Sequence, residues 1–195
     1  MKKVMLYSGG LDSWVISKLW KPDVKLYVDT GSLGSKAEIK KLAPDVIVEK
    51  LDIHKFEIPE RNYILPLRNL YFCMLAMNYG DTICLGATAS STNLDKNETF
   101  CKLASDLLTY LIPQVYPVNA PERINVVVPF KPYSKKQLLQ MYLNQGGDLD
   151  TAFTSTSSCY NPNPDGSPCL NCSSCLKRLA AFRELGYEPK ENNCR

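Results

Sequence analysis

The sequence KVMLY at residues 3–7 runs directly into SGGLDS at residues 8–13. The first segment has the apolar character of a buried strand, and apolar residues recur at helical spacing from Trp14 to Trp20. Glycines let the backbone approach an anion closely, and the helix that follows offers unpaired N–H groups and the positive end of its dipole. This order of strand, glycine-rich turn and helix predicts a phosphate-binding loop. It has neither the Gly-Lys-Ser/Thr of a Walker loop nor the G-x-G-x-x-G of a dinucleotide fold.

The rest of the chain alternates short apolar strands with helices, which favours an α/β fold with a parallel sheet flanked by helices. Ser134 is the expected N-cap of one helix. We place an α/β domain at residues 1–150 and a smaller C-terminal segment at residues 151–195. The expected strands are 24–28, 45–49, 82–85 and 124–128, and the expected helices are 35–42, 69–79, 99–112, 134–144 and 175–185.

Composition excludes several classes of protein. The chain has 195 residues, of which 45% are hydrophobic and 22% charged, as in an ordinary globular protein. A formal net charge of +3 is too small to indicate a nucleic-acid binder. No apolar run approaches the roughly 20 residues of a membrane span, and the N-terminus lacks a signal peptide. We therefore expect a cytoplasmic protein with small-molecule partners, no membrane and no nucleic acid.

Four of the eight cysteines crowd together near the C-terminus: Cys159, Cys169, Cys172 and Cys175. Two overlapping C-x-x-C steps bring sulfurs to one point, and four protein ligands make a closed, structural Zn²⁺ site. An iron–sulfur cluster uses the same ligands and stays open as an alternative, as does a redox dithiol. Cys73 and Cys84 stand in apolar surroundings and are expected in the core.

The phosphate loop resembles the PP-loop of the N-type ATP pyrophosphatases. Together with the cysteines, it resembles one branch, the 7-cyano-7-deazaguanine synthase (QueC) family. Other matches follow in the same order along the chain: Pro66-Leu67-Arg68-Asn69, then Gly86 with Asp95 and Phe100, then Val128-Pro129-Phe130 with Lys135, then Ser158-Cys159-Tyr160 with Arg178 behind the later cysteines. The resemblance implies a Rossmann-like, adenine-nucleotide-hydrolase-like fold, a C-terminal zinc-binding helical segment, and a homodimer.

The resemblance also implies roles for individual residues. The ATP site, with Mg²⁺, would comprise Tyr7, Ser8, Gly9, Gly10, Leu11, Asp12, Ser13, Asp29 and Gly86. Catalysis would use Asp12, Ser13, Arg68 and Lys135, and the substrate would contact Arg68, Asn69, Asn93 and Asp95. Four of these residues have a plainer interpretation: Arg68 as a surface ion pair, Lys135 as a solvated helix residue, and Asn69 and Asp95 as helix caps.

The reaction that the resemblance implies is an ATP-dependent C–N ligation. The carboxylate of 7-carboxy-7-deazaguanine is adenylated, ammonia gives the amide, and a second activation gives the nitrile. AMP- or ADP-type products and pyrophosphate or phosphate are released. The chain departs from the family pattern in the segments that would contact the deazapurine. It has Asp29-Thr30-Gly31-Ser32 for Asp-Tyr-Gly-Gln and Thr92-Asn93-Leu94-Asp95 for Tyr-Pro-Asp-Cys, and it is shorter between the second and fifth strands. An amide product or a different carboxylate therefore stays open.

Three other functions would each fit part of the sequence. A tRNA thiolase or another PP-loop enzyme needs a reactive cysteine near ATP, for which Cys84 and Cys101 are candidates, and a basic RNA-binding face. A non-catalytic zinc- and nucleotide-binding module would not need an intact SGGLDS loop. A nucleic-acid binder would rest on the basic pairs at 135–136 and 177–178, which are more often solvated.

Overall fold

A parallel β-sheet organises the computed structural model, which describes residues 1–32, 35, 38, 39, 42–58, 60, 64–115, 120–159, 163 and 167–188. The five strands of this sheet lie in the order β3-β2-β1-β4-β5, and every neighbouring pair is parallel. They are β1 (Lys3–Leu6), β2 (Val24–Asp29), β3 (Val46–Lys50), β4 (Thr82–Leu85) and β5 (Asn125–Val127). The predicted α/β class and parallel sheet are confirmed.

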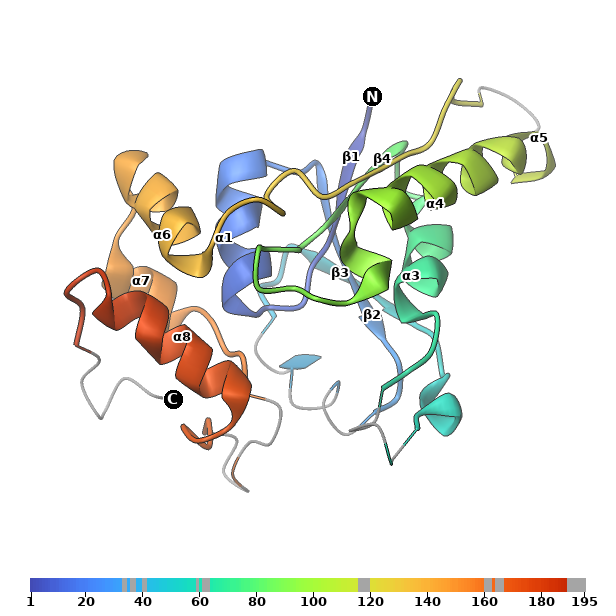
Figure 1. Cartoon of the computed structure of the whole chain (residues 1–195). Helices are drawn as coiled ribbons and strands as arrows, with labels where there is room; N and C mark the ends of the chain where they lie inside the picture. The colour runs from blue at the N-terminus through green and yellow to red at the C-terminus, as the bar shows by residue number, and fades with distance from the viewer. Residues whose placement is uncertain are drawn as a thin grey trace.

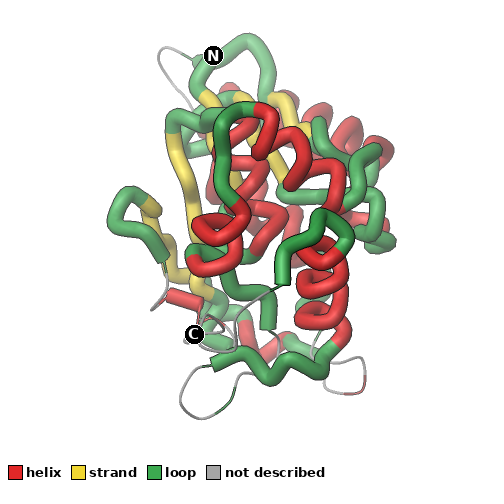
Figure 2. Tube along the Cα trace, turned by 90° about the vertical axis from the view of Figure 1, so that its left-hand side faces the viewer, coloured by secondary structure: helices red, strands yellow, loops and turns green. Residues whose placement is uncertain are grey.

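Helices cover both faces of the sheet (Figure 1). They are α1 (Leu11–Trp20), α3 (Arg68–Ala76), α4 (Glu98–Tyr110), α5 (Ile112–Val115), α6 (Lys135–Asn144), α7 (Leu149–Thr154) and α8 (Ser173–Arg183), with the 3₁₀ turns η1 (His54–Phe56) and η3 (Leu94–Lys96). In Figure 2 the α6–α8 side faces the viewer and the strands lie behind it. No helix in the described part of the chain combines the length and apolarity needed to cross a membrane.

The central strand β1 is buried on both faces. Val4 and Met5 are adjacent, so their side chains point to opposite faces, and both are fully buried. Val4 packs into a cluster with residues of α3 and α4, such as Cys73 and Leu108. Met5 packs into a second cluster with residues of α1, α6, α7 and α8, such as Phe153. Burial on both sides is the pattern expected of a parallel sheet.

The predicted elements differ from the structure mainly at their ends. The predicted helix at 99–112 is divided into α4 and α5, and α7 was not predicted. Much of the predicted helix at 35–42 lies outside the described residues. Ser134 is confirmed as an N-cap, and it forms a capping box with Gln137 at the start of α6.

The C-terminal segment shares the core of the α/β part. Ala181 and Phe182 of α8 belong to the same buried cluster as Met5. Arg178 is also buried, and its guanidinium donates to the carbonyl oxygens of Phe153 and Thr156. The division at residue 150 stays a prediction, and that residue lies inside α7.

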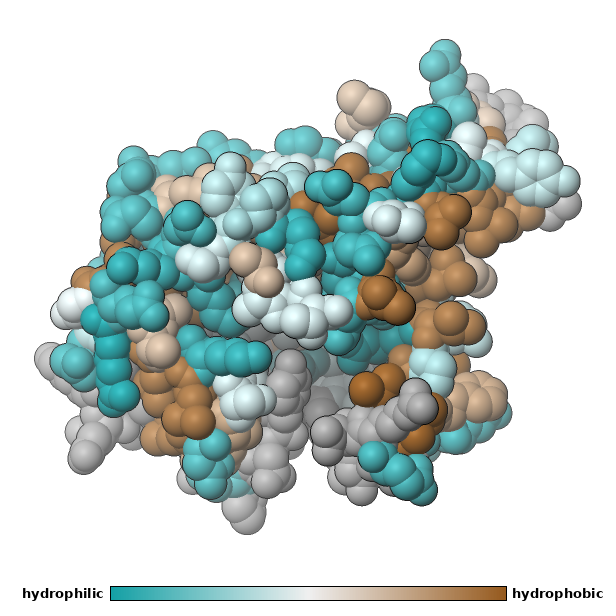
Figure 3. Space-filling model, in the orientation of Figure 1, coloured by the Kyte–Doolittle hydropathy of each residue, from teal (hydrophilic) through white to brown (hydrophobic). Residues whose placement is uncertain are grey.

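One face of α4 is apolar and exposed. Leu103, Leu107 and Tyr110, at helical spacing on this helix, are all exposed, as is Met74 of α3. Figure 3 shows hydrophobic residues gathered over α3 and α4, on the right of the view. We call Leu103, Leu107 and Tyr110 the α4 stripe.

We expect Arg178→Met to lower the free energy of unfolding by about 2–4 kcal/mol, because buried carbonyl oxygens lose a charged donor. Arg183→Met on the same helix is the matched control, since Arg183 is exposed and its partner Glu188 is 3.5 Å away. The control should change stability by less than about 0.5 kcal/mol. Chemical denaturation measures both, and equal losses would contradict the role of Arg178.

Candidate functional site

The phosphate loop lies between the carboxyl end of β1 and the start of α1. Gly9 has φ +70°, a conformation that favours glycine. Gly10 is the N-cap of α1 and provides no side-chain cap for the first turn. The loop is held by hydroxyls instead: the Oγ atoms of Ser8 and Ser13 are 3.1 Å apart, and Ser13 Oγ donates to the Gly10 carbonyl at 3.0 Å.

Two of the predicted loop residues, Tyr7 and Leu11, have buried side chains. The side chains of Tyr7 and Leu11 are buried in the cluster beneath α1. Burial, followed by the charge of Asp45, raises the pKa of Tyr7 to about 12, so its hydroxyl stays protonated. Their main-chain N–H groups are also engaged, since Tyr7 N–H donates to the Leu26 carbonyl at 2.8 Å and Leu11 N–H donates to Ser158 Oγ at 3.2 Å. The predicted contacts of Tyr7 and Leu11 with ATP stay predictions.

Lys135 is distant from the phosphate loop in the sequence, but its side chain contacts Asp12 of that loop. Its ammonium forms an ion pair with the carboxylate of Asp12, and both side chains are about four-fifths buried, at 18% and 22% exposed. Lys135 is the first residue of α6, which packs against α1 through Trp14 and Tyr142, with ring centroids 5.2 Å apart. The plainer interpretation of Lys135 as a solvated residue is wrong. Its predicted catalytic role stays a prediction.

A second group of polar residues comes from α3 and η3. The buried Asn69 amide donates to the backbone carbonyl of Asp95 at 3.1 Å and so ties the two elements together. Arg68 is exposed, and none of the described carboxylates forms an ion pair with it. Burial raises the pKa of the Glu38 carboxyl, and the charge of Arg68 opposes that shift, so the interpretation of Arg68 as a surface ion pair stays open. Asn69 and Asp95 are not helix caps, since the N-caps are Leu67 for α3 and Asn97 for α4.

Lys96 completes this group and was missed from the sequence. It lies within electrostatic range of Arg68, Asp95, Asp12 and Lys135. Burial, and then repulsion from Arg68, lower the pKa of its ammonium. No described residue forms a hydrogen bond or ion pair with that ammonium. No local pattern marks Lys96, because Arg68, Asp12 and Lys135 come near it only in the folded chain.

The remaining predicted residues occupy the same edge of the sheet. Gly86 follows β4 and lies against Ser13, because a Cβ built on it would be 3.6 Å from the Ser13 Cα. Asp29 ends β2 and accepts a hydrogen bond from the Gly31 N–H at 2.9 Å. Asn93 is exposed. Their predicted roles with ATP or substrate stay predictions.

The segment after β2 is braced by its neighbours. The Thr30 carbonyl accepts from the N–H groups of Ile53 and His54, at 3.3 and 3.0 Å. Gly31 has φ +78°, and a Cβ there would be 2.7 Å from Asp52 Oδ1. Glycine at position 31 is therefore favoured by its backbone conformation, while the exposed Asp52 side chain could move to make room for a Cβ.

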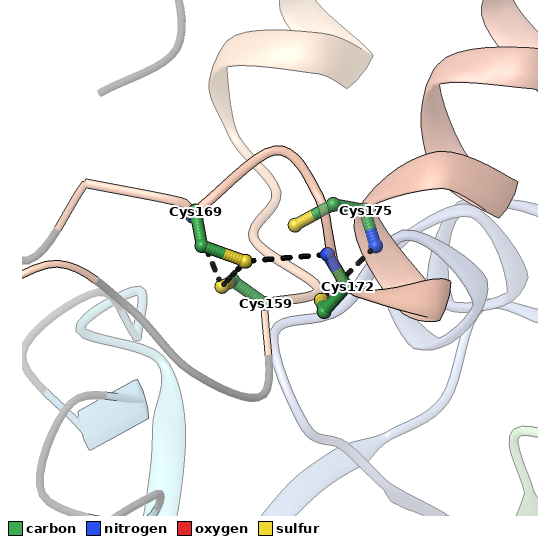
Figure 4. A group of neighbouring side chains, drawn as sticks. All are labelled: Cys159, Cys169, Cys172 and Cys175. Carbon is green, nitrogen blue, oxygen red and sulfur yellow. Dashed lines mark hydrogen bonds between the residues drawn. The ribbon is translucent and has the colours of Figure 1, made fainter.

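The four C-terminal cysteines come together as predicted (Figure 4). Their sulfurs all lie within 4.8 Å of one another. A tetrahedral zinc centre with bonds of about 2.3 Å has sulfur–sulfur edges of about 3.8 Å, so the group fits Zn²⁺. Backbone N–H groups point at the sulfurs, such as Cys169 N–H on Cys159 Sγ at 3.2 Å. N–H groups of Asn171 and Cys172 lower the pKa of the Cys169 thiol.

The other described cysteines are unsuited to nucleophilic chemistry. Cys73, Cys84 and Cys101 are buried, which confirms Cys73 and Cys84 as core residues. Burial, and then Cys101, raise the pKa of Cys84 to about 12, and burial and Glu98 raise that of Cys101 to about 11. Thiols with such pKa values are not reactive at neutral pH, which argues against a thiolase.

Comparison with known proteins agrees with this arrangement. The model of the family described as "Queuosine biosynthesis protein QueC" matches residues 28–186. The chain belongs to the QueC family. It is therefore an ATP-dependent enzyme of the PP-loop type.

Curated relatives cover almost the whole chain. It is 27% identical to the 7-cyano-7-deazaguanine synthase of Persephonella marina over 220 residues, which cover 95% of this chain and 93% of that protein. It is 26% identical to the enzyme of the same name from Chlorobaculum parvum over 237 residues, covering 100% and 98%. Both alignments are longer than the 195 residues of this QueC-family chain, so it lacks residues that these relatives carry.

We expect Lys135→Met to lower kcat/KM for ATP by about 10²–10³-fold, because a positive charge beside the phosphate loop is lost. Lys136→Met is the matched control: Lys136 is half-exposed and its Nζ lies 4.0 Å from Glu184. Steady-state release of AMP, measured for both variants, tests this. A control as slow as Lys135→Met would contradict a specific role for Lys135.

We expect Lys96→Met to weaken ATP or substrate binding while raising the melting temperature by about 1–4 °C, since a half-buried, unpaired charge is removed. A lysine whose pKa is lowered by folding destabilises the fold below that pKa. The difference in melting temperature between Lys96→Met and the wild type should therefore be largest at neutral pH. It should decrease as the pH rises past the lowered pKa of Lys96, and it should vanish above the unfolded value of about 10.4. Melting curves from pH 7 to 11 measure it, and a lower melting temperature at pH 7 would refute it.

Proposed function

We propose that this QueC-family chain converts the carboxylate of 7-carboxy-7-deazaguanine, with ammonia, to the amide and then to the nitrile. One observation carries the proposal. The phosphate loop, Lys135, Lys96 and Arg68 lie within electrostatic reach of one another at the carboxyl edge of the sheet. Both ligands of the reaction, ATP and a purine-like carboxylate, are anions that such a group of cations can hold.

In the first step, a carboxylate oxygen attacks the α-phosphorus of ATP. A carbon–oxygen–phosphorus link forms, the bond between the α-phosphorus and its bridging oxygen breaks, and pyrophosphate leaves. Negative charge develops on the phosphate oxygens as this happens. The first-turn N–H groups of Asp12 and Ser13 and the hydroxyls of Ser8 and Ser13 would bind the phosphates, and Lys135 would leave Asp12 to neutralise them.

Two further steps complete the proposed reaction. Ammonia attacks the acyl carbon, AMP leaves, and a proton is released to give the amide. The amide oxygen then attacks the α-phosphorus of a second ATP, and pyrophosphate and one N–H proton leave. Loss of AMP and the second N–H proton gives the nitrile. None of these steps needs an acid–base pair in the protein, because positioning and charge neutralisation supply the catalysis.

Mg²⁺ belongs to this proposal. Asp12 would be released from Lys135 to help hold it beside the ATP phosphates, and the ion would supply further charge neutralisation there. Zn²⁺ would be held by the four C-terminal cysteines as a closed, structural site. We also place the reaction in the cytoplasm, where thiols are kept reduced, and none of the described cysteines forms a disulfide.

A homodimer is a further part of the proposal. The α4 stripe supports it, because monomeric proteins rarely expose a continuous apolar helix face.

The segments around Asp29 and Asn93, which depart from the family pattern, bear on which product forms. The alternative hypothesis is a PP-loop ligase that forms only the amide or that acts on a different carboxylate.

Mass spectrometry of the products tests the reaction. After incubation with Mg²⁺-ATP, ammonium and 7-carboxy-7-deazaguanine, we expect the nitrile, AMP and pyrophosphate, and no turnover by Ser13→Ala or Asp12→Ala. Accumulation of the amide alone would show that the reaction is truncated. Absence of both products in a protein that binds ATP would show that the substrate is a different acid.

A further inference from the structure

Two serines that precede the first cysteine of the metal centre contact the phosphate loop. Leu11 N–H, in the first turn of α1, donates to Ser158 Oγ at 3.2 Å. Ser157 N–H donates to the Gly9 carbonyl at 3.3 Å. The approach is close, since a Cβ built on Gly10 would lie 3.5 Å from Ser158 Oγ and 3.6 Å from the Ser157 carbonyl oxygen.

The same short segment is held at both of its ends. On one side, Thr156 is buried, and the buried Arg178 guanidinium donates to its carbonyl at 3.0 Å and to its hydroxyl at 3.2 Å. On the other side, Cys159 Sγ accepts from the N–H of Cys169 at 3.2 Å and belongs to the four-sulfur group. Figure 4 shows the N-terminal part of the chain, in faint blue, passing beside the cysteines.

We infer that the cysteine centre and the phosphate loop are a coupled unit, in which Ser158 is a positioning residue and metal occupancy strengthens ATP binding. This inference deepens the proposed function and rests on the proposed ATP site. The ligand that regulates the ATP site is the divalent metal ion held by the four thiolates.

The physical link is conformational. A bound metal ion fixes Cys159 relative to the other three cysteines, and therefore limits where Ser158 can lie. Ser158 in turn holds the Leu11 N–H, and Ser157 holds the Gly9 carbonyl, on either side of Gly10. A loop already held in its ligand-binding conformation loses less entropy when it binds phosphate. Loss of the metal removes that restraint.

Coupling of this kind acts in both directions. If metal binding raises ATP affinity by some factor, ATP must raise metal affinity by the same factor. ATP should therefore slow the release of metal from the cysteines, although the two ligands do not touch the same side chains. A metal centre that only stabilises the fold as a whole would not show this dependence in the folded protein.

The test uses the full-length, zinc-loaded protein and α,β-methylene-ATP, which cannot be cleaved at the α-phosphorus. Affinity is measured by calorimetry, and zinc release by a colorimetric zinc chelator, with and without the analogue. Ser158→Ala is compared with Ser155→Ala, its matched control. Ser155 is exposed, and its N–H bonds within the end of α7, at the Thr151 carbonyl, away from the phosphate loop.

We expect Ser158→Ala to retain zinc but to bind the analogue about three- to tenfold more weakly, the range for one lost hydrogen bond. The analogue should slow zinc release several-fold in the wild type and in Ser155→Ala, and have less effect in Ser158→Ala. If the analogue does not change the rate of zinc release from the wild type, the proposed coupling is wrong. This comparison does not depend on whether Ser158→Ala folds. A wild type that binds zinc but not the analogue overturns the proposed function and the coupling together.

Discussion

Parallel pairing of β1 with β2 on one side and β4 on the other is the constraint on which the rest of the molecule depends. Parallel strands end at the same edge of a sheet, so segments that follow each strand must meet there. The phosphate loop after β1, the braced turn at Gly31 after β2, and the segment from Gly86 to Lys96 after β4 are neighbours for that reason. This pairing is possible only because both faces of β1 are buried, which requires helices from both halves of the chain.

The charges at this edge are not balanced by one another. Asp12 has a partner in Lys135, whereas Lys96 has none among the described residues and Arg68 has no ion pair. Cations held close together raise the free energy of the fold. The carboxylates of Asp12, Asp95 and Glu38 offset this only in part, and an anionic ligand lowers the free energy further. A site of this kind sacrifices some stability for affinity, as functional sites commonly do. The requirement for ligands with several negative charges follows from that arrangement.

The sequence was sufficient for features that depend on local chemistry. Strand and helix periodicity, the glycine-rich turn and the spacing of the four cysteines each follow from residues close together in the chain. Lys96 and Ser158 could not be assigned in this way, because their significance comes from contacts with Arg68 and Leu11, which only the folded chain brings near. Asn69 resembled a helix cap, yet its amide joins two elements. The short helix α7 lacks the length for a periodic signal, and packing of Phe153 stabilises it instead.

Ala181 and Phe182 complete the cluster that covers one face of β1, although they lie near the opposite end of the chain. During synthesis, the first strand leaves the ribosome long before these residues do. That face of the sheet therefore stays incompletely covered until α8 has emerged, because α1, α6 and α7 supply only part of the cluster. We expect nascent chains to expose part of this apolar surface until α8 emerges. The packing beneath the phosphate loop is thus completed by residues that are made more than a hundred positions after it.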